Sequence, residues 1–410
     1  MKLSKNAKNA FVIGTLCSVA YLAVYIARNM LSAVTPEILD AGLLTKDVLG
    51  TLSSAYFTFY AVGQLINGII GDKIKAVYMI SIGLLMAGVT GFLFPLLVSS
   101  GPWLVLLYGM TGFFLSMIYA PMTRVVAEST EPIHAVRCSL GYTFASFFGS
   151  PVAGLCAAAF VWQSAFNVSS SALVLMAVVC YILFTVFERR GIVKYGTRKA
   201  GGSTERTSLG DKVGVLVAHD IARFSAVSML TGIVRTAVLF WMPTYFNEYL
   251  GYSPEKSALI FTVATLVISC NSFIAVWLYE ALGRRRYPSL LILFGVSLVA
   301  FVLTFLVKSP IWNIIFLVLA LIGSNGASSI LWSVYCPSLA DTGMVSSATG
   351  FLDFLSYMAA AIATAVFGNI VSVVGWDNLI LIWTALAALG VAVSFTYGKR
   401  SFLKSDKPKA

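Results

Sequence analysis

The chain has 410 residues, of which 59% are hydrophobic and only 11% are charged, and its mean hydropathy is +0.87. Soluble domains carry about 25% charged residues, so this composition excludes an ordinary soluble protein. The formal net charge of +11 is compatible with nucleic-acid binding. However, the basic residues lie in short loops and tails, which is the pattern that sets the orientation of a membrane protein.

Apolar stretches long enough to cross a bilayer as helices, about 20 residues each, follow one another along nearly the whole chain. Only helices and closed barrels satisfy the backbone in lipid, and these stretches are too continuously apolar for barrel strands. We therefore predict an all-α membrane protein with twelve transmembrane helices. The predicted spans are residues 11–33, 49–71, 77–98, 101–124, 137–160, 169–187, 218–245, 256–280, 288–307, 311–335, 346–371 and 377–397.

The basic start of the chain, residues 1–10, leads into an apolar run that continues past Ala33 without a convincing cleavage site. This pattern predicts a first span rather than a signal peptide. Between the sixth and seventh spans lies a polar stretch, residues 188–217, whose Gly, Ser, Thr and charged residues predict a solvated linker. The predicted organisation is an N-terminal six-helix half, the linker, a C-terminal six-helix half and a tail, over residues 1–187, 188–217, 218–397 and 398–410.

Basic residues predict the orientation. With an even number of spans, both termini and the linker share one side of the membrane. That side collects the N-terminal lysines, Lys73, Lys75, the linker, residues 284–286 and the tail from Lys399. The other side holds little more than Lys46, Lys256 and Lys308. Because cytoplasmic loops carry the excess of Lys and Arg, we predict cytoplasmic termini in the plasma (inner) membrane.

A short motif recurs in the two halves. After the second span Asp72 is followed by Lys73, and after the eighth span Glu280 is followed by Arg284. An acid at a helix end followed by a basic cluster resembles the loop motif of the major facilitator superfamily, in which it forms a latch between helices. The first copy lacks the usual Gly-Arg pair, and ordinary positive-inside charge is the alternative explanation.

Two arginines lie inside predicted spans, where a charge is costly unless it is paired or functional. Arg28 is in the first span and Arg235 in the seventh, so they occupy equivalent helices of the two halves. A guanidinium group matches phosphate or carboxylate oxygens in bidentate geometry and stays charged at any physiological pH. The pair predicts an anion site, whereas snorkelling or structural pairing is the alternative for each arginine.

Several segments together resemble the organophosphate:phosphate antiporters, the family of bacterial glycerol-3-phosphate and hexose-6-phosphate transporters. The first helix carries Tyr21, Tyr25 and Arg28, and the seventh carries the run RTAVLFWMPTYF from Arg235. Further segments are Pro121 with Arg124, Gly350-Phe351 with Tyr357, and Gly375-Trp376-Asp377. The likeness is co-linear over nearly the whole chain, and it implies the major facilitator fold of two six-helix halves.

The resemblance implies roles for individual residues. Arg28 and Arg235 become the phosphate-binding pair, and Tyr21, Tyr25 and Tyr357 become hydrogen-bonding groups of the cavity. Asn325 joins the candidate substrate-binding residues. Gln64 and Ser146 take positions where the phosphate exchangers have a basic residue and a histidine.

Asp353, one turn before Tyr357, stands where the resemblance leads us to expect a small residue. Beside the arginines it would be ionised, as a structural bridge to Arg28 or Arg235. Isolated in a dry cavity it would instead carry a proton. With Asp72, Lys73, Glu280 and Arg284, it forms the set of candidate coupling or gating residues.

The resemblance implies a secondary transporter that exchanges a phosphorylated metabolite, such as glycerol-3-phosphate or a sugar phosphate, for inorganic phosphate. An alternative is a proton-coupled symporter of a sugar acid or other carboxylate. It is favoured by Asp353 and by the smaller number of basic residues in the cavity than in the phosphate exchangers. A transporter-like sensor of sugar phosphates is a further alternative. We expect no enzyme activity, cofactor, metal or nucleic-acid partner, and a monomer in the bilayer.

Overall fold

A computed structural model describes residues 5–71, 74–193, 220–339 and 345–395, and all regular structure in these residues is helical. The chain divides into two compact units, Met1–Ser203 with Gly251–Thr265, and Thr204–Leu250 with Leu266–Ala410. We describe each unit by itself. The predicted all-α fold is confirmed for the described residues.

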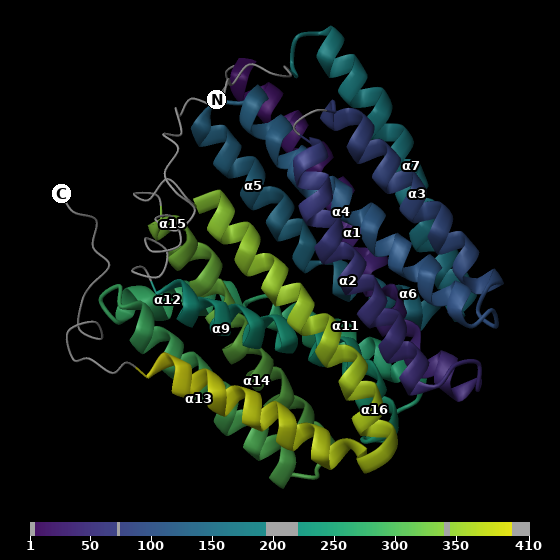
Figure 1. The fold of residues 1–410 in the computed structure, drawn as a ribbon, viewed down its shortest axis with the longest axis vertical. Coiled ribbons are helices and arrows are strands. Elements are labelled where there is room, and N and C mark those ends of the chain that lie inside the picture. The colour runs from purple at the N-terminus through teal and green to yellow at the C-terminus, as the bar shows by residue number, and fades with distance from the viewer. Residues whose placement is uncertain (1–4, 72–73, 194–219, 340–344, 396–410) are drawn as a thin grey trace. The chain divides into compact units, whose positions relative to one another are not determined.

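The first unit is a bundle of long helices. They are α1 (Lys5–Asp40), α2 (Lys46–Gly71), α3 (Ala76–Leu96), α4 (Pro102–Ser129), α5 (Pro132–Phe147), α6 (Gly149–Ala159) and α7 (Trp162–Arg189). α2 and α3 pack against α4, α3 packs against α7, and α1 packs against α5 and α6 (Figure 1). α2 and α4 approach closely because Gly112 has no side chain: a Cβ there would lie 2.3 Å from the carbonyl oxygen of Tyr56. Small residues allow such close packing of helices in membranes.

The second unit is also a bundle of helices. Its helices are α9 (Ile221–Ile233), the π-helical turn η1 (Val234–Val238), α10 (Leu239–Glu248), α12 (Asn271–Ala281), α13 (Arg286–Leu306), α14 (Pro310–Ile330), the π-helical turn η2 (Leu331–Tyr335), α15 (Cys336–Ser338) and α16 (Val345–Ser394). The first unit also includes most of α11 (Pro254–Ile268), from its start to Thr265. Within the second unit α13 packs against α14 and α16, and α9 packs against α16.

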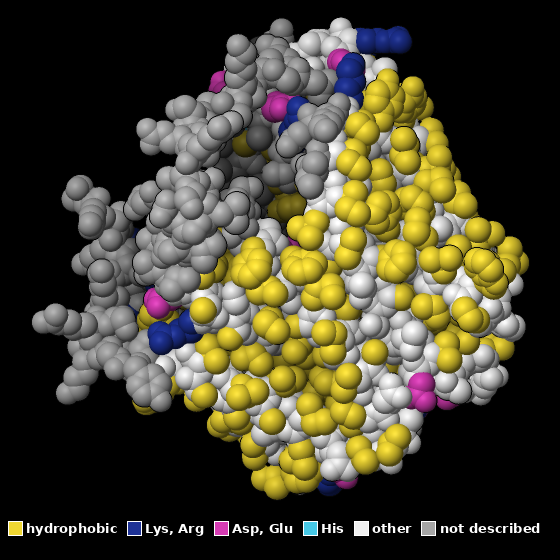
Figure 2. All heavy atoms as spheres, in the orientation of Figure 1, with side chains coloured by type: hydrophobic (Ala, Val, Ile, Leu, Met, Phe, Trp, Pro, Cys, Tyr) yellow, Lys and Arg dark blue, Asp and Glu magenta, His cyan; other side chains and the backbone are white. Residues whose placement is uncertain are grey.

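Membrane-crossing character is shared by most of these helices. Nine helices among the described residues are long and apolar enough to cross a membrane. Hydrophobic side chains cover much of the face seen in Figure 2, where few Lys and Arg side chains appear among the described residues. Large apolar side chains such as Trp277 and Val373 are mostly exposed, which suits contact with lipid rather than water.

α16 contains the predicted span 346–371 and the part of the predicted span 377–397 that ends at Ser394. A straight helix of its 50 residues would be about 75 Å long, far more than the ~30 Å hydrocarbon core. Gly375 breaks it with φ 81° and ψ 178°, a conformation that glycine adopts without a steric cost. The two resulting rods turn back on one another (Figure 1).

Two predicted spans are interrupted rather than continuous. The span predicted at 137–160 divides at Phe148 into α5 and α6. Pro151 explains the break, because a proline lacks an amide hydrogen and its ring clashes with the carbonyl four residues earlier. The span predicted at 256–280 divides at Ser269 and Cys270, where the Asn271 side-chain amide donates a hydrogen bond to the free carbonyl of Ile268 over 2.7 Å.

Candidate functional site

Arg28 lies on α1 of the first unit, surrounded by aromatic rings. Its Cζ atom is 5.3 Å from each of the ring centres of Tyr25, Phe57 and Tyr60. A guanidinium group over the face of an aromatic ring is stabilised by about 0.5–2 kcal/mol. These rings come from α1 and α2, so the two helices together hold the Arg28 side chain.

A cluster of tyrosines extends this site along α1. The Tyr21 ring centre lies 5.0 Å from that of Tyr25, 5.5 Å from that of Tyr119 and 6.0 Å from that of Tyr142. Tyr119 belongs to α4 and Tyr142 to α5, so three helices contribute. The structure therefore brings together Tyr21, Tyr25 and Arg28, and their role in substrate binding stays a prediction.

Four aromatic residues of this site were not predicted, namely Phe57, Tyr60, Tyr119 and Tyr142. A sequence signal existed for two of them: Phe57 and Tyr60 precede Gln64 by seven and four residues. Residues at these spacings share one face of a helix. The half-buried Gln64 therefore lies on the same face of α2 as the rings beside Arg28.

Arg235 lies in η1 of the second unit. Its Nε and Nη2 atoms are buried and have no hydrogen-bond partner among the described residues. Its Cζ atom lies 5.7 Å from the centre of the Tyr357 ring. Burying the donor atoms of a charged group without acceptors costs free energy, and such a cost is typical of functional sites. The missing partner of a guanidinium fork is an oxyanion.

The helices around Arg235 are fixed by close contacts between α9 and α16. Ser228 Oγ donates a hydrogen bond to the carbonyl oxygen of Leu352 over 2.7 Å. A Cβ at Gly232 would lie 2.6 Å from the carbonyl oxygen of Ser356. In α10, Trp241 Nε1 donates to the carbonyl of Thr364 over 3.2 Å. These contacts flank Arg235 and hold it beside Tyr357, in a π-helical turn of a kind often found at functional sites.

Asp353 is half-buried on α16, one turn before Tyr357. Residues four apart share one face of a helix, so Asp353 lies on the same face of α16 as Tyr357, whose ring contacts Arg235. Asn325, on α14, is 8% exposed, and its backbone carbonyl accepts a hydrogen bond from Ser329 Oγ over 3.2 Å.

The candidate gating residues are described only in part. Asp72, Lys73 and the side chain of Ser146 lie outside the described residues. Glu280 is exposed in the last turn of α12 and Arg284 is exposed just beyond it, and no ion pair joins them in the part of the chain that the structure describes. Arg284 adopts φ 59°, in the turn that ends the helix.

An ion pair does form next to the first copy of the motif. Lys75 Nζ lies 2.7 Å from Glu188 Oε1 and connects the loop before α3 to the end of α7. The hydrogen bond to Glu188, together with its negative charge, raises the pKa of the exposed Lys75 above its ordinary value. This pair lies entirely in the first unit, and the sequence did not predict it.

Comparison with known protein families gives one match over most of the chain. The profile of the Major Facilitator Superfamily matches residues 17–364. Solved structures agree at the level of the fold. A bacterial homolog of the human lysosomal transporter Spinster, in an inward-facing and unoccupied conformation, has a TM-score of 0.79 at 13% identity, covering 99% of this chain and 100% of that one.

Characterised relatives share low identity over nearly full length. A phosphoglycerate transporter protein of Salmonella typhimurium is 24% identical, covering 87% of this chain and 82% of the relative. A glycerol-3-phosphate transporter of Bacillus subtilis is 22% identical, with 93% and 91% covered. The membrane sensor protein UhpC of Escherichia coli is also 22% identical, with 95% and 91% covered. These names confirm the resemblance predicted from the sequence.

Proposed function

The chain belongs to the major facilitator superfamily and is a multi-pass membrane transporter rather than an enzyme, and we propose that it exchanges a phosphorylated metabolite for inorganic phosphate. Glycerol-3-phosphate, phosphoglycerate or a sugar phosphate is the proposed organic substrate, because full-length relatives are named for such compounds. The proposed location is the plasma (inner) membrane, with both termini cytoplasmic and a monomer as the working unit.

The half-buried Arg235 guanidinium is the observation that carries this proposal. Two of its nitrogen atoms are buried without a hydrogen-bond partner among the described residues, yet the group is permanently charged. A phosphate has several oxygens in the geometry that a guanidinium fork recognises. An organophosphate would therefore supply the missing acceptors.

Arg28 is the proposed second anion-binding residue. Arg28 lies in the first predicted span and Arg235 in the seventh, which are equivalent helices of the two halves. Three aromatic rings contact the Arg28 guanidinium. A fixed charge in a low-dielectric environment is costly when no anion is bound. A carrier with such a site would change conformation readily only when loaded, which favours exchange over net uptake. The other proposed substrate-binding residues are Tyr21, Tyr25, Tyr357, Gln64, Ser146 and Asn325.

The proposed coupling and gating residues are Asp353 together with Asp72, Lys73, Glu280 and Arg284. Asp353 supports a second candidate function, proton-coupled uptake of a carboxylate. The supporting observation is that Asp353 places a half-buried carboxylate on α16 one turn before Tyr357, the residue whose ring contacts Arg235. A sensor role is a third candidate, favoured by the similarity to a named membrane sensor.

Proteoliposomes containing the purified protein separate these functions. We expect uptake of labelled phosphate or glycerol-3-phosphate only when phosphate or an organophosphate is loaded inside. Arg28→Lys and Arg235→Lys should each lower exchange by about 10- to 100-fold, because a point charge does not replace a bidentate fork. Uptake that needs no internal phosphate and collapses with the proton gradient would favour the symporter. Tight binding without any flux would favour the sensor.

A further inference from the structure

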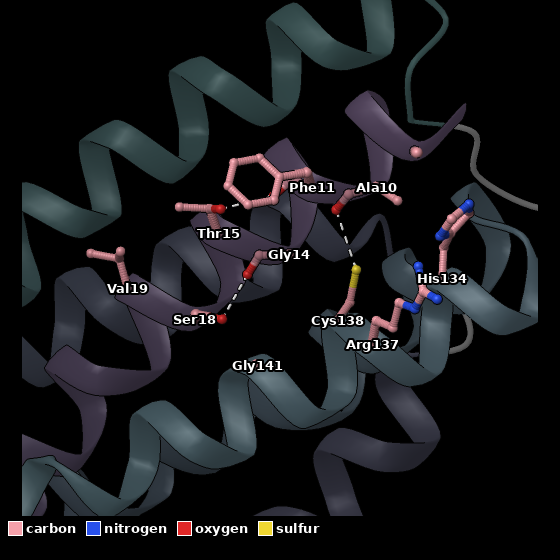
Figure 3. Close-up of a pocket in the computed structure, with 11 residues that line it drawn as sticks. Ala10, Phe11, Gly14, Thr15, Ser18, Val19, His134, Arg137, Cys138 and Gly141 are labelled. Carbon is pink, nitrogen blue, oxygen red and sulfur yellow. Dashed lines mark hydrogen bonds between the residues drawn. The ribbon is translucent and has the colours of Figure 1, made fainter. Parts of the chain in front are cut away.

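A groove of about 370 Å³ runs between α1 and α5 in the first unit (Figure 3). From α1 it is lined between Ala7 and Val19, and from α5 between His134 and Gly141. Twelve helical rises separate Ala7 from Val19, so the groove is about 18 Å long. One leaflet is about half of the ~30 Å hydrocarbon core. The groove therefore has the length of a single leaflet.

The walls of the groove are chemically apolar although they contain hydroxyl and thiol groups. Thr15 Oγ1 donates to the carbonyl of Phe11 over 2.8 Å, and Ser18 Oγ donates to the carbonyl of Gly14 over 2.8 Å. Cys138 Sγ donates to the carbonyl of Ala10 over 3.2 Å. These hydrogens are already bonded to the backbone (dashed lines in Figure 3), so the groove presents mainly carbon to an occupant.

Small residues place the two helices close together and leave the groove open along its outer edge. A Cβ at Gly14 would lie 2.8 Å from Cys138 Sγ, and one at Gly141 would lie 3.1 Å from Ser18 Oγ. On the rim, Phe11 is 69% exposed and Val19 is 46% exposed. The rim of the groove is therefore open and apolar, which suits contact with an acyl chain.

Positive charge gathers at one end only. His134 and Arg137 lie at the end near the start of α1, and Val19 lies at the other (Figure 3). The carboxylate of Glu131 offsets His134, since it lies 3.8 Å from His134 Nε2 and also accepts a hydrogen bond from Asn6 Nδ2 over 2.8 Å. The exposed Arg137 has no ion pair among the described residues. Arg137 is therefore the cation that remains available to a ligand.

We propose that this groove is a binding site for one anionic phospholipid. Its phosphate contacts Arg137, and one acyl chain lies between Phe11 and Val19. Basic pockets between transmembrane helices are suited to anionic headgroups, and the whole groove, with its headgroup end, is about as long as one leaflet is thick. α1 is polar up to Ala10 and apolar from Phe11, which puts the headgroup at the membrane surface. The inference does not depend on which metabolite is transported.

Native mass spectrometry of the delipidated full chain tests the site. The probes are phosphatidylglycerol and phosphatidylcholine with the same acyl chains. We expect wild type to prefer phosphatidylglycerol by about fivefold, the factor that corresponds to about 1 kcal/mol per basic residue. Arg137→Gln should abolish the preference and Arg137→Lys should restore it. Arg190→Gln, at an exposed arginine beyond the end of α7, is the matched control and should change nothing.

A second variant tests the apolar part of the groove. Thr15 is exposed and lines its middle, so Thr15→Trp should fill the groove and lower binding of both lipids without unfolding the protein. Unchanged lipid binding in Thr15→Trp, or an intact preference in Arg137→Gln, would overturn the proposal. Displacement of the lipid by free glycerol-3-phosphate would also count against it, because that result indicates a soluble-anion site.

Discussion

The Cζ atom of Arg235 lies 5.7 Å from the centre of the Tyr357 ring, so a half-buried cation on η1 is in contact with an aromatic ring on α16. The ring contacts the guanidinium, whose Nε and Nη2 atoms are buried without an acceptor among the described residues. The same guanidinium therefore bears on both substrate binding and protein stability. Replacing it should change the two in opposite directions.

Replacing Arg235 should separate stability from function. We expect Arg235→Leu to raise the Tm of the purified protein, because the substitution removes a buried charge that lacks hydrogen-bond acceptors. The same variant should lose at least about 100-fold in exchange rate, about 2.7 kcal/mol. Thermal unfolding in detergent and phosphate exchange in proteoliposomes are the measurements. A lower Tm would show that the guanidinium stabilises the fold.

The ring of Tyr357 and its hydroxyl group should have separable roles. Tyr357→Phe keeps the ring beside Arg235, so we expect a modest loss of substrate affinity, about threefold. Tyr357→Leu also removes the cation–π contact, which is worth about 0.5–2 kcal/mol, and should weaken binding by a further ~3- to 30-fold. Ligand-induced Tm shifts with glycerol-3-phosphate measure both effects. Equal effects of the two variants would exclude a role for the ring.

The contact of Gly232 with α16 should be intolerant of any side chain. A Cβ at this position would lie 2.6 Å from the carbonyl oxygen of Ser356, and backbone cannot move aside cheaply. We expect Gly232→Ala to destabilise the protein by about 1–3 kcal/mol, seen as a lower Tm. Gly350→Ala is the matched control on α16, since a Cβ there meets nothing within 4 Å. A similar Tm for both variants would contradict the packing argument.

The ion pair of Lys75 with Glu188 should give a stability contribution that depends on pH. The hydrogen bond and charge of Glu188 raise the pKa of Lys75 above 10.5. The contribution is therefore complete below the ordinary lysine pKa and is lost as the pH rises through the raised pKa. We expect Lys75→Gln to lower Tm slightly at neutral pH and not at all in strongly alkaline buffer. A difference that persists there would show that the contact is not ionic.

Salt gives an independent check on the same pair. Both side chains are accessible, with 50% of Lys75 and 36% of Glu188 exposed, so salt should screen the attraction. The Tm difference between wild type and Lys75→Gln should shrink as the salt concentration rises. Lys8→Gln, at an exposed lysine of α1, is the control for a general effect of charge.

Hydropathy and charge predicted the helical membrane fold because lipid imposes its requirements on every residue of a span. The interruptions were harder to predict. Pro151 was a usable signal for the break at Phe148, but the break at Ser269 and Cys270 has no proline or glycine to mark it. There the side chain of Asn271 bonds a freed carbonyl, which depends on local three-dimensional structure.

The candidate site was predicted in part. Arg28 and Arg235 were visible because charge is rare within apolar spans. The rings beside Arg28 were not, because an aromatic residue in a membrane helix is as ordinary facing lipid as facing a ligand. Tyr119 and Tyr142 come from helices that are distant from α1 in sequence, and only packing reveals that they meet Tyr21.

The reversal of α16 at Gly375 has a practical consequence for mapping topology. A single non-helical residue, Gly375, joins its two rods. An inserted epitope or protease site requires an exposed loop tip, and this connection has no loop to accept one. The turn at Gly42, between α1 and α2, is better suited. Its φ is 66°, and residues 41–43 are exposed. A tag placed there would report sidedness with little disturbance to the helices.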